Sequence, residues 1–355
     1  MREQPNLAID TIVACLTGRY GLDIASVAFL PLGYDFNAAV YRVTTGDGTP
    51  YFLKLRFGPV NEAALLVPRV LTDLGVPNVL APLRTRSADL WSPLAGASAV
   101  LYPFIEGENV AVAGLTDDQW REFGATLLAV HTSGLGDQFR DQLPVETFSL
   151  PSAALVRRVL GETDAAVVGG MVAARFAAFW RANAGSIRAL LARAEALSAR
   201  LRATPFEFVL CHADIHAANI LAGVDGRIWL VDWDGPIIAP RERDLLFVVG
   251  STIARPVTPR EEDLFFEEYG PAEVNPVALA YYRYERMIED IGEAGRRVLF
   301  DPDVGEEARA EDAALAMDFF APGGMVERAE TVTRQRWPDP SPYCAGTTNG
   351  DHPRS

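Results

Sequence analysis

Residues 210–221 read LCHADIHAANIL and place two histidines, an aspartate and an asparagine between apolar residues. The polar pattern is H-x-D-x-x-x-x-N over residues 212–219. Thirteen positions after its asparagine, the apolar stretch RIWLVDWDGP carries Asp232 and Asp234. Polar groups on apolar segments are costly to bury unless they are paired, so their presence indicates a site. The sequence therefore predicts a polar site carried by two neighbouring strands.

Upstream, residues 26–57 predict an antiparallel meander. Apolar alternation in AAVYRV and YFLKLRF flanks TTGDGT, whose Asp-Gly pair is a tight-turn signal. The later strand carries Lys54, the only lysine in the chain. A lysine on an apolar strand needs an anionic partner, because a buried ammonium alone is costly. Glu62, at the start of the predicted helix 61–75, is a candidate partner, and an ordinary solvated helix residue is the alternative.

These groups together suit phosphoryl transfer from a nucleotide, a reaction that depends mainly on positioning and charge stabilisation. A lysine can steady the α- and β-phosphates, and carboxylate and amide oxygens are the ligands that Mg²⁺ prefers. Asp232 and Asn219 fit the metal roles, and Asp214 fits the role of the base that receives the acceptor proton. A mere loop-capping role for Asp214 and Asn219 is disfavoured by the matched spacing to Asp232.

Helical periodicity begins near Thr116, where Thr116 and Gln119 form a capping-box pattern ahead of an apolar face. Further helices are predicted over residues 171–203, as one helix or two, over 261–295 and over 305–319. The tail, residues 338–355, is rich in Pro, Ser and Gly and is predicted to be disordered.

Composition limits the function classes. The 355-residue chain is 49% hydrophobic and 22% charged, and its net charge is −15. This charge speaks against nucleic acid as a partner and permits a cationic substrate, although plain solubility explains it equally well. No apolar run is long enough to span a membrane, and the N-terminus has no signal-type apolar region, so we expect a cytoplasmic protein. Three scattered cysteines suit a reducing compartment.

The catalytic pattern, together with DWDGPIIAPRERDLLFV, FFEEYG and YYRYERMIEDI, resembles the aminoglycoside phosphotransferase family, and its spectinomycin phosphotransferase branch in particular. The resemblance implies an α+β, bilobal, protein-kinase-like fold. Residues 1–104 would form a small antiparallel β N-lobe with one helix, and residues 105–337 a larger, mainly helical C-lobe. The two lobes would join at YPFIEG, residues 102–107.

The resemblance also implies residue roles around a nucleotide, with ATP as the expected cofactor together with Mg²⁺. Asp214 would be the catalytic base, Asn219 and Asp232 would bind magnesium, and Lys54 with Glu62 would orient the phosphates. His212 would hydrogen-bond backbone near the metal site, and Asp244 would brace the catalytic loop.

The nucleotide's other contacts are expected at the hinge and the phosphate loop. The Pro103 carbonyl and the Ile105 amide would hold the adenine. The phosphate loop, LPLGYDFNAAV, is not a G-x-G-x-x-G pattern; it keeps Gly33, and Asn37 is a candidate to replace a backbone donor. GTP therefore stays open as an alternative.

The acceptor pocket is expected to be acidic. Candidate substrate residues are His216, Asp234, Tyr281, Glu285, Glu289 and Asp290. The last four lie on one helical segment and could hold cationic amines, whereas a solvated acidic stripe is the alternative. His216 could instead cap its loop, and Asp234 could only form a turn.

The sequence therefore predicts an ATP-dependent O-phosphotransferase that acts on an aminocyclitol antibiotic, by resemblance spectinomycin, and confers resistance. The chain leaves no room for an activation segment after Asp234, which argues against a protein substrate. One alternative is a kinase of the same fold for a nucleoside-type antibiotic or a metabolite hydroxyl. Another is a catalytically inactive nucleotide-binding protein. Monomer and homodimer both stay open.

Overall fold

The computed structural model describes residues 4–32, 37–163, 170–302, 304–328 and 331. The chain forms two compact units, each assembled from three segments. Unit 1 comprises Met1–Val145, Phe208–Ile238 and Thr258–Pro271, and unit 2 comprises Glu146–Glu207, Ala239–Val257 and Ala272–Ser355. The boundaries predicted at residues 104 and 337 stay predictions, and the tail 338–355 lies outside the described residues.

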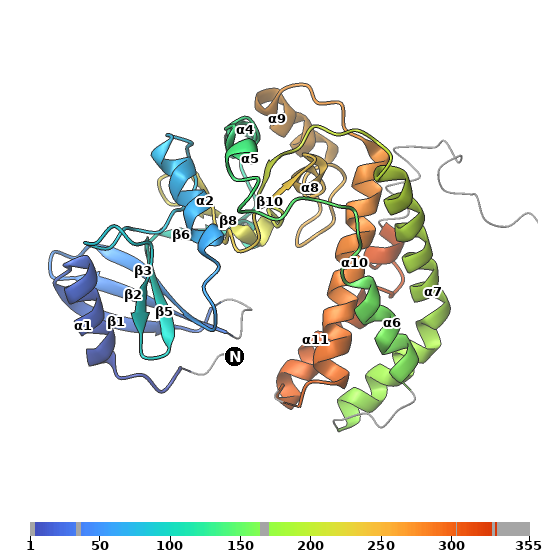
Figure 1. Ribbon diagram of the computed structural model, residues 1–355, viewed down its shortest axis with the longest axis horizontal. Coiled ribbons are helices and arrows are strands. Elements are labelled where there is room, and N and C mark those ends of the chain that lie inside the picture. The colour runs from blue at the N-terminus through green and yellow to red at the C-terminus, as the bar shows by residue number, and fades with distance from the viewer. Residues whose placement is uncertain (1–3, 33–36, 164–169, 303, 329–330, 332–355) are drawn as a thin grey trace, which may run out of the picture. The chain divides into compact units, whose positions relative to one another are not determined.

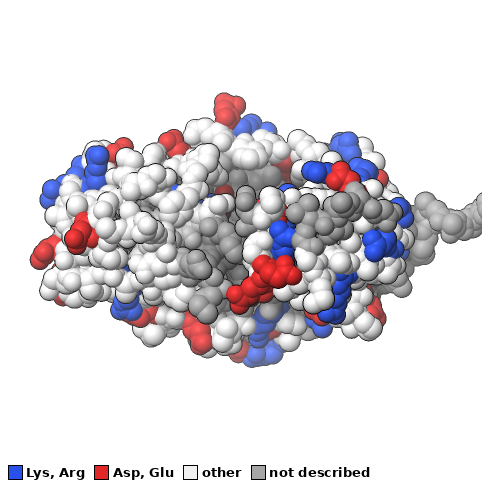
Figure 2. Space-filling model, turned by 90° about the horizontal axis from the view of Figure 1, so that it is seen from below, with Lys and Arg blue, Asp and Glu red and all other residues white. Residues whose placement is uncertain are grey.

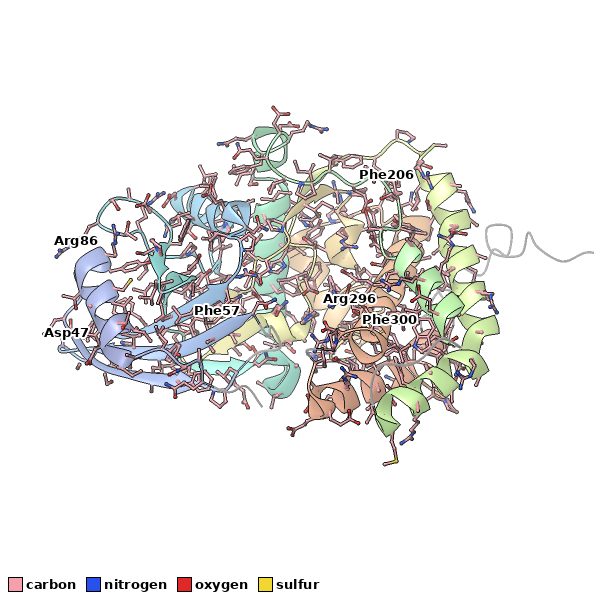
Figure 3. All side chains as sticks on the ribbon, turned by 60° about the horizontal axis from the view of Figure 1, so that its bottom comes forward. Asp47, Phe57, Arg86, Phe206, Arg296 and Phe300 are labelled. Carbon is pink, nitrogen blue, oxygen red and sulfur yellow. The ribbon has the colours of Figure 1, made fainter. Side chains whose placement is uncertain are left out.

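A five-stranded antiparallel sheet in the order β1-β2-β3-β5-β4 opens unit 1 (Figure 1). Its strands are β1 (Ile24–Leu30), β2 (Ala38–Thr45), β3 (Pro50–Phe57), β4 (Ser92–Leu94) and β5 (Ala97–Pro103). The meander predicted over residues 26–57 is confirmed. In the β2–β3 turn, Asp47 accepts hydrogen bonds from the Thr45 hydroxyl and the Thr49 N–H. Figure 3 labels Asp47 at this turn and Phe57 at the end of β3.

The two faces of the sheet differ because side chains alternate along each strand. Leu53 and Leu55 of β3 are fully buried in a core with Ile12 and Leu16 of helix α1 (Ile9–Tyr20). Phe52, Lys54 and Arg56 therefore lie on the opposite face. Helix α1 was not predicted from the sequence, although its two core residues have the i, i+4 spacing of one helix face.

The rest of unit 1 joins this sheet to two smaller ones, β6-β8-β9 and β10-β7. Its further elements are α2 (Glu62–Asp73), β6 (Gly107–Asn109), α3 (Val110–Ala113), α4 (Asp117–His131), α5 (Leu135–Gln138), β7 (Val209–Cys211), the 3₁₀ helix η1 (Ala217–Asn219), β8 (Ile220–Gly223), β9 (Ile228–Leu230), β10 (Ile237–Ala239) and α9 (Pro259–Tyr269). The capping box predicted at α4 is confirmed, since Thr116 and Gln119 hydrogen-bond each other's backbone N–H.

Helix α4 is the platform for the β8–β9 hairpin. Gln119 donates to the Gly226 carbonyl at 3.1 Å, and Glu122 accepts the Ile228 N–H at 3.0 Å. On its other side α4 packs against α9, where Gly124 lets the two helix backbones approach closely. Packing of α4 therefore bears on the strand that leads to Asp232.

Unit 2 is mainly helical, as predicted. Its helices are α6 (Ala153–Glu162), α7 (Met171–Leu201), α8 (Glu242–Leu245), α10 (Pro276–Leu299) and α11 (Glu306–Asp318). Helices α7 and α10 pack side by side with α6 and α11 against them (Figure 1). The stretch predicted over 171–203 is one helix.

The region predicted to be helical, residues 261–295, forms two helices rather than one. Helix α9 ends at Tyr269 and α10 begins at Pro276. Gly270 follows α9 with a φ of 82°, which favours glycine, and Asn275 caps α10 by accepting the N–H groups of Val277 and Ala278. The break matters because it separates the acidic α9 in unit 1 from the predicted substrate helix in unit 2.

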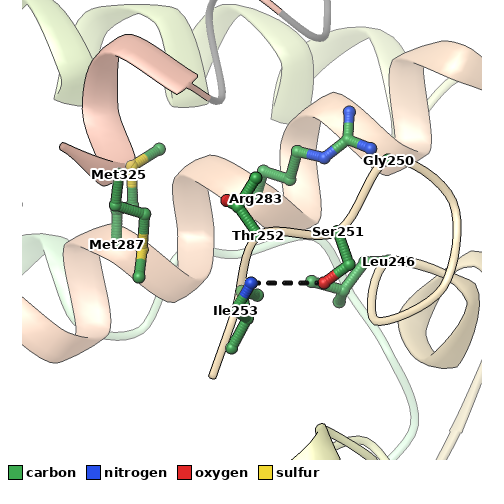
Figure 4. Close-up of a pocket in the computed structure, with 8 residues that line it drawn as sticks. All are labelled: Leu246, Gly250, Ser251, Thr252, Ile253, Arg283, Met287 and Met325. Atoms are coloured by element: carbon green, nitrogen blue, oxygen red, sulfur yellow. Dashed lines mark hydrogen bonds between the residues drawn. The ribbon is translucent and has the colours of Figure 1, made fainter. Parts of the chain in front are cut away.

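Surface charge is mixed, and unit 2 contains hollows lined by described residues. Acidic and basic side chains are interspersed on the face shown in Figure 2. The hollow in Figure 4, lined by Ser251, Arg283 and Met287 among others, measures about 20 Å³, room for about one water. A larger hollow of about 410 Å³ lies in unit 2 between α6 and α7. Neither is lined by a predicted site residue. Among the described helices, none is both long and apolar enough to cross a membrane.

Candidate active site

Strand β3 presents the chain's only lysine to two carboxylates. The Lys54 side chain is 15% exposed, and its Nζ lies 2.9 Å from Asp232 Oδ1 and 3.4 Å from Asp234 Oδ2. Burial alone would lower the pKa of Lys54, but the two carboxylates outweigh it and raise the pKa above its usual value. Burial alone would likewise raise the pKa of Asp232, but Lys54 outweighs it and holds the pKa low. The ammonium therefore stays charged where it lies.

Asp214 and Asn219 are joined on the catalytic loop. The Asn219 Nδ2 donates to the Asp214 carbonyl oxygen at 2.8 Å and to its carboxylate Oδ2 at 3.2 Å. The amide nitrogen is thus used within the loop, which leaves the amide oxygen as the group able to bind a cation. The Val231 N–H donates to the Asn219 carbonyl at 3.0 Å, so the backbones that carry Asn219 and Asp232 are adjacent.

His212 connects the segment that carries Asp214 to the segment that carries Asp232. It is fully buried; its Nε2 lies 3.0 Å from the Val231 carbonyl, and its Nδ1 accepts the Asp214 N–H at 3.3 Å. Because Nδ1 accepts, Nε2 carries the proton and donates. The ring also packs on Trp233, with centroids 4.4 Å apart. These contacts link the backbone before Asp214 to the backbone before Asp232.

Strained backbone adjoins both key carboxylates. Ala213, just before Asp214, has a φ of 72°, and Asp232 itself has a φ of 62°. This left-handed region costs a non-glycine residue about 1–2 kcal/mol, so surrounding contacts must hold it. His212 and Lys54 supply such contacts. Strain of this kind concentrates at functional sites.

His216 caps η1 and faces Asp214. Its Nδ1 accepts the Ala218 N–H at 3.2 Å, and its Nε2 lies 3.6 Å from Asp214 Oδ1. The Asp214 side chain is 40% exposed. One carboxylate oxygen therefore accepts a hydrogen bond from Asn219, and the other lies near His216.

The predicted nucleotide contacts are placed less completely. Pro103 ends β5, and Ile105 follows it in a connection without regular structure. Asn37 is exposed just before β2, whereas Gly33 lies outside the described residues. Glu62 is exposed at the first turn of α2, and Lys54 pairs instead with the two carboxylates. The Lys54–Glu62 pair is therefore not made in this structure, because Asp232 and Asp234 hold the ammonium.

The acids of the predicted substrate helix, α10 in unit 2, differ in exposure and in ion pairing. Glu285 is 12% exposed and forms an ion pair with Arg243 of α8. Burial raises the pKa of Glu285 to about 7, although Arg243 acts in the opposite direction. Asp290 pairs with Arg286 at 3.2 Å. Glu289 is exposed and makes no ion pair with another residue that the structure describes.

Two other predicted residues of unit 2 are buried. Tyr281 is fully buried, with its ring 5.4 Å from that of Phe148, so its burial argues against a substrate contact. Asp244 is fully buried in α8, and its predicted contact with the catalytic loop of unit 1 stays a prediction.

Sequence reasoning missed three residues that organise these charges. Arg56 Nη1 lies 2.7 Å from Asp234 Oδ1, Asn61 Nδ2 donates to the Asp234 carbonyl at 3.0 Å, and Arg243 holds Glu285. A signal existed for Arg56, since it lies two positions after Lys54 on the same strand face. Asp234, predicted to meet the acceptor, is thus held by the strand that carries Lys54.

Comparisons with known proteins identify the family and the fold. A family model for the phosphotransferase enzyme family, APH, matches residues 28–287. The structure of spectinomycin phosphotransferase APH(9)-Ia in complex with ADP and spectinomycin is similar, with a TM-score of 0.83 and 32% identity over 93% of this chain and 99% of that one. The AMP-bound complex of the same enzyme gives a TM-score of 0.80 and 31% identity over 92% of this chain and 99% of that one.

More distant structures share the fold alone. Macrolide 2'-phosphotransferase MphH from Brachybacterium faecium has a TM-score of 0.53 and 20% identity over 88% of this chain and 98% of that one. A sequence comparison with curated proteins finds no match. The family model and the similarity to APH(9)-Ia are sufficient together: the chain belongs to the APH phosphotransferase family and has its kinase-like fold.

Proposed function

We propose that this phosphotransferase moves the γ-phosphoryl group of ATP to a hydroxyl of an aminocyclitol antibiotic, most specifically spectinomycin. The observation that carries the proposal is the 32% identity to APH(9)-Ia across 93% of this chain, since that enzyme is described with ADP and spectinomycin. Phosphorylation would place negative charge where the drug's target expects a neutral hydroxyl, and the drug would lose binding.

The residues present fit a divalent cation. Asp232 offers a half-exposed carboxylate, and the Asn219 amide oxygen remains after its nitrogen has bonded Asp214. Hard oxygen donors of this kind suit Mg²⁺, and Asp232 and Asn219 would hold it. When bound, Mg²⁺ would supply positive charge that offsets the negative charge developing on the transferred phosphoryl group. Lys54 would contact the phosphates, and the Pro103 carbonyl and Ile105 N–H would meet the adenine.

Asp214 would receive the acceptor proton. The acceptor oxygen forms a bond to the γ-phosphorus while the bond from that phosphorus to the bridging oxygen breaks, and ADP leaves. Asn219 fixes one Asp214 oxygen, so the other can orient the hydroxyl and take its proton. His216, beside that second oxygen, would limit the directions from which the hydroxyl approaches.

The acids predicted to contact the acceptor's cationic groups lie on α10 of unit 2, and their contact with the acceptor stays a prediction. Arg243 already neutralises Glu285, and Arg286 pairs with Asp290. Glu289 is exposed, so we propose it as the first acid to contact an amine of the drug.

The test is drug-dependent ADP release by purified protein with ATP and Mg²⁺, using spectinomycin, a macrolide and choline as acceptors in parallel. We expect turnover with spectinomycin, and mass spectrometry should find the phosphorylated drug. Asp214→Asn should lower turnover by about two to four orders of magnitude while nucleotide affinity stays nearly unchanged. Absence of any spectinomycin-dependent ADP release would exclude this acceptor, and turnover with another alcohol would name the replacement.

A further inference from the structure

Asp234 lies between two cations from one strand. One of its oxygens is 2.7 Å from Arg56 Nη1, and the other is 3.4 Å from Lys54 Nζ. Both cationic side chains are mostly buried, at 24% and 15% exposure. Lys54 is also 2.9 Å from Asp232. Two positive and two negative groups thus form one chain of contacts, Arg56–Asp234–Lys54–Asp232.

The segment 232–234 is fixed from three sides. Asn61, the residue before α2, donates to the Asp234 carbonyl at 3.0 Å. The Trp233 side chain turns the opposite way, into the core, where its Nε1 donates to the Leu230 carbonyl at 3.3 Å. Asp232 meanwhile holds a left-handed φ of 62°. A residue in this conformation needs neighbours on both sides that fix it.

We propose that Arg56 is a positioning residue for the phosphotransfer site. By holding Asp234 against β3, Arg56 keeps Asp232 aligned for its cation and limits how closely Asp234 pairs with Lys54. The inference rests on the proposed function only for the roles of Asp232 and Lys54; the contacts themselves are independent of any acceptor.

The charges explain why a second cation is needed. Without Arg56, Lys54 alone would face two carboxylates, and each would compete with phosphate for its ammonium group. Asp234 would then be free to close the 3.4 Å gap to Lys54. Arginine suits the task because its guanidinium is planar and always charged. If the Arg56–Asp234 contact were an ordinary exposed ion pair, its loss would change little at Lys54 or Asp232. Experiment can therefore distinguish such a pair from the proposed positioning role.

The single lysine gives a direct readout that needs neither nucleotide nor acceptor. Acylation of Lys54 in the ligand-free protein can be followed by peptide mass spectrometry, because no other side-chain amine is present. Arg56→Met should slow labelling by about threefold to tenfold, because Asp234, released from Arg56, would pair more closely with the Lys54 ammonium group and protect it from the reagent. Asp234→Asn should accelerate labelling, because the neutral amide no longer forms an ion pair with the Lys54 ammonium group.

The matched control is Arg69→Met. Arg69 pairs with Asp73 at the same 2.7 Å and is 17% exposed, but it lies on α2 among residues outside the site. We expect wild-type labelling in this variant. The affinity for Mg²⁺ is measured by calorimetric titration into ADP-saturated protein. It should fall about tenfold in Arg56→Met, as expected when a residue that orients a metal ligand is lost, and should not change in Arg69→Met.

The proposal is overturned if Arg56→Met labels Lys54 within twofold of wild type and binds Mg²⁺ normally, as the control does. Should Arg56→Met fail to fold, Asp234→Asn decides, because unchanged labelling there also overturns the proposal. Failure of every tested antibiotic as acceptor would refute the proposed substrate without altering either readout.

Discussion

Gly124 is the position at which one added methyl group should most damage the platform of the active site. A Cβ built at Gly124 of α4 would lie 2.1 Å from the Phe265 carbonyl oxygen and 3.0 Å from the Tyr269 nitrogen of α9. Both neighbours are backbone atoms, so no side-chain rotation relieves the clash. The helices would have to separate by about 1 Å, since carbon and oxygen rarely approach closer than about 3 Å without a bond.

The expected cost of Gly124→Ala follows from this displacement. Overpacking a tight core costs about 1–3 kcal/mol and occasionally more, and a backbone clash belongs at the upper end. Alanine gains about 1 kcal/mol of helix propensity over glycine, which offsets only part of it. We therefore expect a net loss of about 2 kcal/mol. For a protein of this size that loss lowers the thermal midpoint by roughly 3 °C.

The assay is thermal unfolding of the ligand-free protein, with Gly185→Ala as the matched control. Gly185 lies inside α7, and no atom would lie within 4 Å of its Cβ outside its own helix. The same substitution should there leave the midpoint unchanged or raise it slightly, because only the propensity term remains. A midpoint of Gly124→Ala at or above that of wild type would refute the account of α4–α9 packing.

Three further outcomes are expected. Thr116→Ala removes one half of the α4 capping box and should cost about 1 kcal/mol in denaturant unfolding, with Thr116→Ser close to wild type. The pKa of Glu285 is raised to about 7 in the folded state, so as pH rises the unfolded chain releases this proton first. The free energy of unfolding should therefore fall as pH rises from about 4.5 to about 7. Glu285→Gln should flatten this slope, and an unchanged slope would contradict the effect of burial on Glu285. Asp232 has a lowered pKa, so its contribution is present above about pH 4 and is lost as pH falls further; Asp232→Asn should reduce the acid-induced loss of stability relative to wild type.

Local sequence patterns predicted much of the architecture. The period-2 alternation of β3 requires Leu53 and Leu55 to face one side and Lys54 the other, and the core against α1 agrees. The turn at Asp47 and the capping box at Thr116 depend on contacts within a few residues, so the sequence contains all that they require. Such features are predictable because their partners are near in the chain.

Long-range partners were not predictable in the same way. Asp234 meets Arg56 across 178 positions, and Glu285 meets Arg243 across 42, and nothing in either local pattern selects the partner. The helical face to which Tyr281 turns also depends on neighbours such as Phe148, which no periodicity identifies. Helix α1 was missed because Ala8 offers no side-chain cap that would mark its start.

The contacts Arg56–Asp234–Lys54–Asp232 suggest how the same residues can be stable both without and with a bound nucleotide. Lys54 and Arg56 balance Asp232 and Asp234, so no buried charge in this group lacks a partner before a nucleotide binds. On nucleotide binding, Lys54 would exchange Asp232 for the phosphates and Asp232 would hold the cation, while Arg56 would keep its contact with Asp234. Each group then exchanges one partner of opposite charge for another, and none is left bare in a partly buried setting. A site with Lys54 as its lone cation would face the same exchange with one carboxylate in excess, which is why the arginine two positions further along β3 belongs to the same chemistry.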